Sequence, residues 1–486
     1  MKSYKVRMWD LAHWAHRKKS PYGVRWTVDG KPFSSWFANK TPADRYRGKL
    51  LTAMEKGEPF DTETGLPDSL AAGKGSMTWY ELAVKYVDAK WSLAAANSRV
   101  SIAETMTAVT MAYLNKVSGR PDDATLRRAL RGWAFNPNKR DTPQPADVAA
   151  ALKWVTKASR SLRAMAQDSQ EAARILDSFT LLLDGKKASA STISRKRRVL
   201  YNALEYAVSI KKLPANPLPS LDWKAPKASG NIDRRVVVSP AQMRELLTAV
   251  SYVGSYHRAR GRRLVAFFAC FYFAMMRPAE LVGLKEENCH LPDEGWGLLL
   301  LSDTRPSAGK AWTDSGQTHD ERGLKQRDEG DTRPVPIPPE LVKILKAHIE
   351  EFGTADDGRI FTNERGGLVG SSTYYRVWAE ARTYAFPPEK VASKLAARPY
   401  DLRHGGVSLG LNGTADPTDV AERAGHSVET LLRVYAKCID GRRDANNKLI
   451  EDRLNEGTAK AEQPPATRKT GDVRRRRKPK GYDRPS

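Results

Sequence analysis

Four short stretches in the C-terminal half of the chain carry residue types suited to attack on a phosphodiester. They read AMMRPAELVGL, RGLKQRDEGDTRPVPIP, RPYDLRHGG and AGHSVETLLRVY. A tyrosine hydroxyl that attacks a backbone phosphodiester keeps the energy of the broken bond in a covalent intermediate. The transition state places extra negative charge on the non-bridging oxygens, which two arginine forks stabilise without a metal. Arg277 and Arg403 fit the arginine role, and Tyr435 fits the nucleophile.

Tyr435 stands near the end of a predicted amphipathic helix, nine residues after His426. Ser427 is a capping residue type, and helical spacing sets Tyr435 above Leu431 and Leu432, so its ring can pack inward while its hydroxyl leaves the core. Because a free tyrosine has a pKa of about 10, it needs cationic surroundings to attack at neutral pH. The alternative is an ordinary core tyrosine, with a histidine that satisfies backbone groups at the helix start.

The order and spacing of the four stretches resemble the tyrosine recombinase family, and in particular the integrases of actinobacterial phages and integrative plasmids. Arg277 and Glu280 match its first box, Arg-Pro-x-Glu-hydrophobic-x-x-Leu. The stretch DLRHG, the Gly-His step before the last helix and Tyr435 match its second box. The resemblance implies that His426 donates a hydrogen bond to a phosphate oxygen.

The resemblance also implies a lysine on a hairpin loop that protonates the leaving 5′-oxygen. Lys325 in LKQR, ten residues before the VPIP stretch, is the first candidate. Lys310 in SAGKAW is the rival, because the loop is longer than the minimal hairpin of the family.

Tyr400 departs from the family pattern, since much of the family has a histidine three residues before the second arginine. The usual general base is therefore missing, and water, another residue or Tyr400 itself must serve. His404, which matches the family's Arg-His step, and Glu280 are expected to brace the site through hydrogen bonds. Met276 stands where the family often has glycine, which affects packing more than chemistry.

The charge of the chain favours a polyanionic partner. Lys and Arg number 81 against 56 Asp and Glu, a net charge of +25 over 486 residues. Nucleic acid is favoured over membrane, because no run of about 18 apolar residues occurs. The N-terminus also lacks a signal-peptide pattern. We therefore expect a cytoplasmic protein of a bacterial host, associated with the nucleoid.

Cysteine and histidine spacing gives no support to a metal site. Cys270, Cys289 and Cys438 are far apart, and no CxxC or HExxH motif occurs. Phosphate-binding glycine loops are also missing from the sequence. We expect no metal and no cofactor.

Hydrophobic periodicity predicts a mainly α-helical protein with small β elements. Residues 20–40 alternate around an Asp-Gly turn and predict a hairpin, and 296–303 and 332–339 predict strands that flank a charged loop. The expected domains are a small α+β arm-binding module, a helical core-binding domain of the SAM-like type, a linker, a mixed α/β catalytic domain and a basic disordered tail. They span residues 1–70, 76–218, 219–235, 236–455 and 456–486.

Two groups of basic residues are candidates for DNA contact. The helix predicted around residue 200 carries Arg195, Lys196, Arg197 and Arg198 opposite an apolar stripe. Arg25 and Lys31 lie on the predicted hairpin. The alternative for both groups is an ordinary solvated face.

The resemblance implies a site-specific DNA recombinase that acts at double-stranded attachment sites through a 3′-phosphotyrosine and integrates a phage or mobile element. It implies a homotetramer in the synaptic complex, aided by a DNA-bending host factor and a directionality factor. The amphipathic segment 443–456 is expected to pack either on a neighbouring subunit or on the subunit to which it belongs. Strand relaxation of the type IB topoisomerase kind and a catalytically silent DNA-binding regulator are the alternatives.

Overall fold

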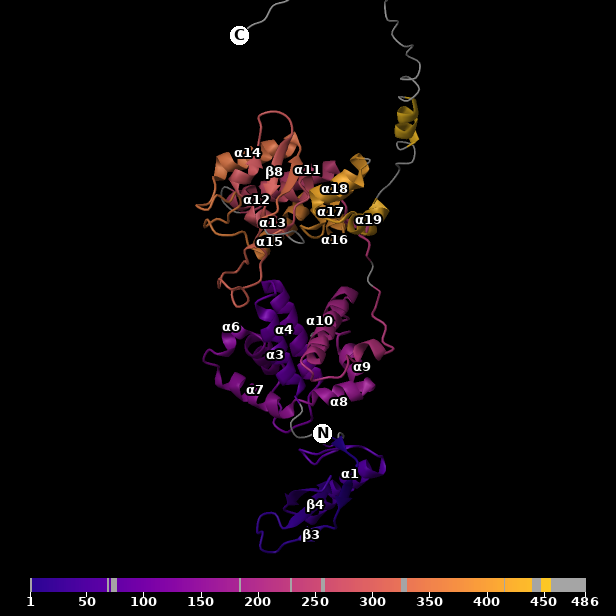
Figure 1. Ribbon diagram of the computed structural model, residues 1–486. Helices are drawn as coiled ribbons and strands as arrows, with labels where there is room; N and C mark the ends of the chain where they lie inside the picture. The colour runs from indigo at the N-terminus through magenta and orange to yellow at the C-terminus, as the bar shows by residue number, and fades with distance from the viewer. Residues whose placement is uncertain are drawn as a thin grey trace, which may run out of the picture.

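The computed structural model shows three successive bodies, coloured indigo, magenta and orange to yellow in Figure 1. Each has its own hydrophobic core, and the C-terminal body has a second, smaller one around Tyr435. We call the bodies the N-terminal module, the helical domain and the C-terminal domain. The structure describes residues 2–67, 70, 77–182, 185–227, 230–254, 258–324, 330–414, 416–438 and 447–455.

The N-terminal module is a small antiparallel sheet covered by one helix. Its elements are β1 (Lys2–Ser3), β2 (Val6–Met8), β3 (Ala12–His13), β4 (Tyr22–Val28), β5 (Lys31–Phe37), α1 (Lys40–Glu55) and β6 (Phe60–Asp61). The predicted hairpin is confirmed: β4 pairs with β5 from Val28↔Lys31 to Tyr22↔Phe37. Asp29 and Gly30 both have positive φ, as a two-residue hairpin turn requires.

One face of this sheet is buried and the other is open. Val24, Trp26 and Val28 alternate along β4 and join the core with residues of α1, whereas Arg25 is exposed between them. On the open face the Trp14 and Trp36 rings lie 4.6 Å apart, with the Arg17 guanidinium 4.1 Å from the Trp36 ring.

The helical domain contains the predicted series of amphipathic helices. They are α3 (Trp79–Trp91), α4 (Ala96–Ala112), α5 (Asp123–Ala129), the π-helical turn η1 (Leu130–Ala134), α6 (Pro137–Arg140), α7 (Ala146–Ala158), α8 (Leu162–Gln167), α9 (Ser169–Ser178) and α10 (Ala190–Ser209). In α10 the predicted apolar stripe is buried at Ile193, Leu200 and Leu204. A capping box of Thr78 and Glu81 starts α3, and Ser189 caps α10.

The C-terminal domain packs helices around a small antiparallel sheet of order β11-β8-β7, with a further strand pair β9-β10. The predicted strands are β8 and β11, which pair from Gly297↔Ile337 to Leu301↔Arg333. Its elements are α11 (Pro240–Ser251), α12 (Ala259–Phe273), α13 (Pro278–Gly283), β7 (Cys289–His290), β8 (Gly297–Leu301), β9 (Asp303–Thr304), β10 (Arg322–Gly323), β11 (Arg333–Ile337), α14 (Pro339–Phe352), α15 (Ser371–Ala385), α16 (Pro388–Ala392), α17 (Asp401–Gly413), α18 (Pro417–Ala424) and α19 (Val428–Tyr435).

The apolar run RRLVAFFACFYFAMM predicts a central helix of the domain, and α12 is that helix, buried on nearly every side. It ends at Phe273, before Met275 and Met276 of that run. Met275 adopts a left-handed φ of 51°, a conformation that costs energy for a residue with a side chain. This turn aims the Met275 carbonyl at the Arg403 guanidinium, so the strain lies where the candidate site begins.

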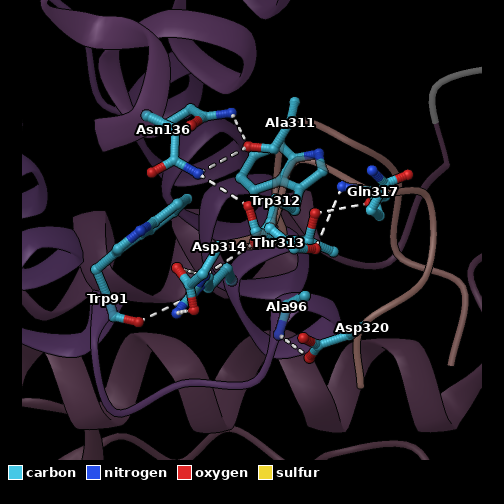
Figure 2. A network of polar contacts seen from close by, with 12 residues as sticks. Trp91, Ala96, Asn136, Ala311, Trp312, Thr313, Asp314, Gln317 and Asp320 are labelled. Atoms are coloured by element: carbon cyan, nitrogen blue, oxygen red, sulfur yellow. Dashed lines mark hydrogen bonds and ion pairs between the residues drawn. The ribbon is translucent and has the colours of Figure 1, made fainter. Parts of the chain in front are cut away.

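The loop between β9 and β10 joins the C-terminal domain to the helical domain (Figure 2). We call residues 305–321 the docking loop. Its Trp312 is 6% exposed and lies in the helical-domain core, beside Trp91. The buried Arg99 of α4 donates to both Asp314 carboxylate oxygens at 2.7 and 2.9 Å and to the Trp312 carbonyl at 3.0 Å. Asn136 donates to the Ala311 carbonyl at 3.1 Å. The sequence predicted only a charged loop here.

The docking loop is expected to stabilise the helical domain measurably. Trp312→Ala removes a buried indole from that core and should lower its free energy of unfolding by about 3 kcal/mol, measured by urea denaturation. The matched control is Lys310→Ala, an exposed residue of the same loop, which should change the value by less than about 0.5 kcal/mol. If both substitutions lowered the free energy of unfolding by the same small amount, Trp312 would not stabilise the helical domain.

Candidate active site

Arg277 stands at the start of α13, where its backbone and side chain are both held by Glu280. The Arg277 amide donates to Glu280 Oε2 at 2.7 Å, and Nη1 donates to Oε1 at 2.8 Å. Its Nη2 donates to the Gly425 carbonyl at 2.5 Å. The side chain keeps 21% of its surface exposed, so it can still meet a ligand.

Glu280 is buried and also binds an arginine that sequence reasoning missed. Arg333 of β11 is 1% exposed and donates through Nη2 to Glu280 Oε2 at 2.8 Å. Burial opposes ionisation of Glu280, but Arg333, Arg277 and Arg403 outweigh it and lower the pKa of the carboxyl. The sequence did hold one sign that Arg333 is buried: it alternates with Val335 and Ile337, the inward-facing residues of the same strand.

Arg403 of α17 is fully buried beside the same group. Its Nη1 donates to the Met275 carbonyl, and its Nη2 donates to the Ala424 carbonyl at 2.5 Å and lies 2.9 Å from His426 Nε2. Burial lowers the pKa of Arg403, yet a guanidinium stays charged in proteins. Two expected arginines and one unexpected arginine therefore surround a single carboxylate.

Glycines make room for this arrangement. A Cβ at Gly425, which has φ of +62°, would overlap the Arg333 guanidinium, so only glycine fits the turn before His426. In α17 a Cβ at Gly406 would overlap the Tyr272 backbone of α12. The two glycines of the DLRHGG stretch therefore let α17 approach α12 closely enough to bring Arg403 to Met275.

The tautomer of His426 follows from its partner. A guanidinium has only donors, so His426 Nε2 must accept from Arg403. Burial, followed by Arg403 and Arg277, lowers the pKa of His426 to about 3, so the ring is neutral at neutral pH and carries its proton on Nδ1. Nδ1 is buried without a hydrogen-bond partner, which leaves one N–H donor in the site.

Tyr435 is the last residue of α19, with its ring buried beside Leu431 and its hydroxyl 2.8 Å from His404 Nδ1. Leu432, which the sequence also placed beneath the ring, is 39% exposed. Ser427 caps α19 as predicted. Burial raises the pKa of the Tyr435 phenol, although Arg403 and Arg277 act to lower it.

Tyr400 and His404 line the same side of α17. Their rings meet edge to face with centroids 5.1 Å apart, and the Arg403 guanidinium carbon lies 6.0 Å from the Tyr400 ring. Burial lowers the pKa of His404 to about 4. His404 was expected to brace the site, but it contacts the hydroxyl of the candidate nucleophile directly.

The two lysine candidates are in different situations. Lys325 lies outside the described residues. Lys310 is exposed on the docking loop, next to Ala311 and Trp312, which pack on the helical domain. Lys310 therefore lies at the helical domain, whereas Arg277 and Arg403 lie in the C-terminal domain.

The candidate DNA-contact residues are all on accessible surfaces. On α10, Arg195 and Arg198 are exposed, while Lys196 and Arg197 are half-buried over the rings of Phe179 and Trp223. Arg197 and Arg198 line an open hollow with Ser194 and Tyr201. In the N-terminal module, Arg25 is on the open sheet face and Lys31 begins β5.

Within the described residues, no helix is both long and apolar enough to span a membrane. The same part of the chain holds no cluster of three or more His, Cys, Asp or Glu side chains that could hold a metal ion.

Comparison with known proteins finds the likeness in structure alone. No family model matches the chain, and no curated protein matches it. The solved structure of the Tn1549 transposon integrase in complex with circular intermediate DNA is similar, with TM-score 0.50 and 15% identity over 78% of this chain and 100% of that chain. A lambda integrase dimer bound to a core site follows, with TM-score 0.45 and 14% identity over 89% and 95%. The chain therefore has the fold of the Tn1549 integrase, and the expected fold class is confirmed.

The Arg333–Glu280 pair is expected to stabilise the C-terminal domain. Arg333→Leu leaves a buried carboxylate with fewer cationic partners and should lower the free energy of unfolding by about 3 kcal/mol, measured by urea denaturation. Arg322→Leu, on the exposed strand β10, is the control and should change it by less than about 0.5 kcal/mol. A loss for Arg333→Leu no larger than that of the control would show that the pair is not needed.

The two half-buried histidines of the site predict acid sensitivity. Their folded pKa values, about 4 for His404 and about 3 for His426, lie below the unfolded value of about 6.5. The unfolded chain therefore takes up protons that the folded chain does not, so stability is full above about pH 6.5 and falls as pH drops toward about 4. Unfolding midpoints in urea across this window should fall less steeply for a His404→Gln, His426→Gln double variant. If the unfolding midpoints of wild type and variant fell in parallel with pH, the acid sensitivity would not come from His404 and His426.

Proposed function

We propose that this protein is a site-specific DNA recombinase that cleaves and rejoins strands at attachment sites through a covalent 3′-phosphotyrosine. The observation that carries the proposal is the convergence of Arg277, Arg403, His426 and Tyr435, which come from separate parts of the chain. The fold shared with the Tn1549 integrase supports it. Integration of a phage or other mobile element, as the sequence resemblance implies, is the biological setting that we propose.

The site has a surplus of positive charge that suits a phosphodiester. Three arginines surround one carboxylate, and further donors of Arg277 and Arg403 contact the backbone carbonyls of Met275, Ala424 and Gly425. Nε of Arg333 and Nε of Arg403 are buried without a hydrogen-bond partner. A phosphate oxygen is a stronger acceptor for a guanidinium than a carbonyl is. We infer that the phosphate displaces carbonyl contacts of Arg277 and Arg403, and that the turn from α18 to α19 shifts because Arg403 is fully buried.

Each site residue then has a role. Arg277 and Arg403 bind the non-bridging oxygens, and the free Nδ1–H of His426 donates to one of them. Tyr435 attacks phosphorus, and Glu280 with Arg333 fixes Arg277. Lys325 is proposed as the proton donor to the leaving 5′-oxygen, since Lys310 is held at the helical domain.

The other surfaces are assigned to DNA and to assembly. The basic residues of α10, namely Arg195, Lys196, Arg197 and Arg198, would contact the core site, while Arg25 and Lys31 of the N-terminal module would contact a separate arm site. The C-terminal helix at 447–455 exposes Leu449, Ile450 and Leu454. These apolar residues support packing on a neighbouring subunit in a homotetramer. A DNA-bending host factor and a directionality factor would complete the reaction.

Tyr435→Phe should abolish the covalent protein–DNA adduct on a suicide substrate nicked near the cleavage site. DNA affinity should change less than about threefold, because the ring still packs and only one hydroxyl is lost. The adduct is measured on denaturing gels and the affinity by titration.

The outcomes separate the candidate functions. An adduct that survives Tyr435→Phe would move the nucleophile elsewhere, with Tyr400 examined first. Wild-type protein that binds DNA but never forms an adduct would be a silent regulator. Wild-type protein that forms the adduct and relaxes supercoils, without exchanging strands between two attachment sites, would be a topoisomerase.

A further inference from the structure

The hydroxyl of Tyr435 has a basic partner that the sequence resemblance did not assign. His404 Nδ1, on α17, lies 2.8 Å from Tyr435 Oη, at the end of α19. The two rings are tilted by 57° with centroids 5.7 Å apart. Tyr435 is 1% exposed and His404 is half-buried, so bulk water has limited access to the shared proton.

The other histidine of the site cannot take this proton as it stands. The lone pair of His426 is on Nε2 and already accepts from Arg403 at 2.9 Å, and its Nδ1 carries a hydrogen. Tyr400, at the position where the resemblance would place a histidine, is a phenol and no better a base than Tyr435 itself. His404 is therefore the histidine that can take the proton. Its imidazole is neutral, and its Nδ1 can present a lone pair to the Tyr435 hydroxyl.

We propose that His404 is the general base that removes the Tyr435 proton during strand cleavage. This inference rests on the proposed function. As Tyr435 Oη forms its bond to phosphorus, the Oη–H proton passes to His404 Nδ1, and the bond from phosphorus to the 5′-oxygen breaks. The 5′-oxygen takes a proton from a separate acid, and the products are a 3′-phosphotyrosine, a 5′-hydroxyl and an imidazolium. In the rejoining step His404 returns the proton to the departing phenolate oxygen.

The surroundings of His404 set when it can accept a proton. Arg403 and Arg398 oppose its protonation, whereas Asp401 favours it. A bound phosphate adds negative charge beside the arginines, which stabilises the imidazolium. The phenol also becomes more acidic as its oxygen transfers charge to phosphorus, so proton transfer accompanies attack. The titratable and charged groups that face His404 are Arg398, Tyr400, Asp401 and Arg403 from its own helix and the turn before it, Tyr435 from α19, and His426 from the turn before α19.

The test is the pH dependence of adduct formation on a suicide substrate by the full-length protein. With His404 as the base, the wild-type rate constant should vary little from about pH 6 to about pH 9. His404→Asn should lower it at neutral pH by about 10²–10⁴-fold. Its residual rate should rise roughly tenfold per pH unit, because only the phenolate then reacts. Added imidazole should restore part of the rate of His404→Ala, which leaves space for it.

Four controls separate the outcomes. Tyr400→Phe should keep a flat pH profile whatever its rate, and a steep profile for it together with a flat one for His404→Asn would assign the base to Tyr400. A 5′-phosphorothiolate substrate, which needs no proton on the leaving group, should not rescue His404→Asn. DNA affinity is titrated for every variant, and His404→Gln is measured beside His404→Asn so that one folded variant is available.

A flat profile and no imidazole rescue in the folded His404 variants would overturn the role of His404 while leaving the recombinase proposal standing. A wild-type protein that forms no adduct at any pH would instead overturn the proposed function.

Discussion

Burial of arginine charge is the constraint on which the C-terminal domain depends. Arg403 and Arg333 are almost wholly buried, and within the described part of the chain Glu280 is the one carboxylate that contacts the group. Taking such charges out of water is costly unless each donor finds an acceptor. The fold supplies carbonyl oxygens through a left-handed turn at Met275 and a glycine turn at Gly425. The local strain and the glycine positions follow from that requirement.

The same cluster is the physical basis of the proposed phosphate binding. One carboxylate does not balance three guanidinium groups, and the depressed pKa values of both site histidines keep them neutral instead of adding charge. An anion that enters the site therefore gains electrostatic energy from groups that are already positioned. This is the preorganisation that a phosphoryl-transfer transition state uses.

Local patterns predicted the elements and the residues that those elements carry. The hairpin at residues 22–37, the buried helix α12 and the strands β8 and β11 were visible as alternating or continuous apolar patterns, and three of the four short motifs indicated Arg277, Arg403, His426 and Tyr435. Partners far apart in sequence could not be predicted in this way. Arg333 lies 53 residues from Glu280, and Asp314 lies 215 residues from Arg99. Lys325 stays a prediction, because it lies outside the described residues.

The His404 contact illustrates the same limit on a smaller scale. The Arg-His step showed that a histidine follows Arg403, but only the packing of α19 on α17 and α18 reveals that its Nδ1 meets Tyr435. Two neighbouring residues of one helix thus have different proposed roles: Arg403 is proposed to bind the phosphate, and His404 contacts the proposed nucleophile, Tyr435.

The most direct test of the central claim is mass spectrometry of the protein–DNA adduct after trapping, nuclease digestion and trypsin cleavage. Tyr435 lies between Arg433 and Lys437, so the account predicts a nucleotide mass on the short peptide spanning residues 434–437. A nucleotide found on a peptide that carries Tyr400 or any other tyrosine, with the 434–437 peptide unmodified, would contradict it.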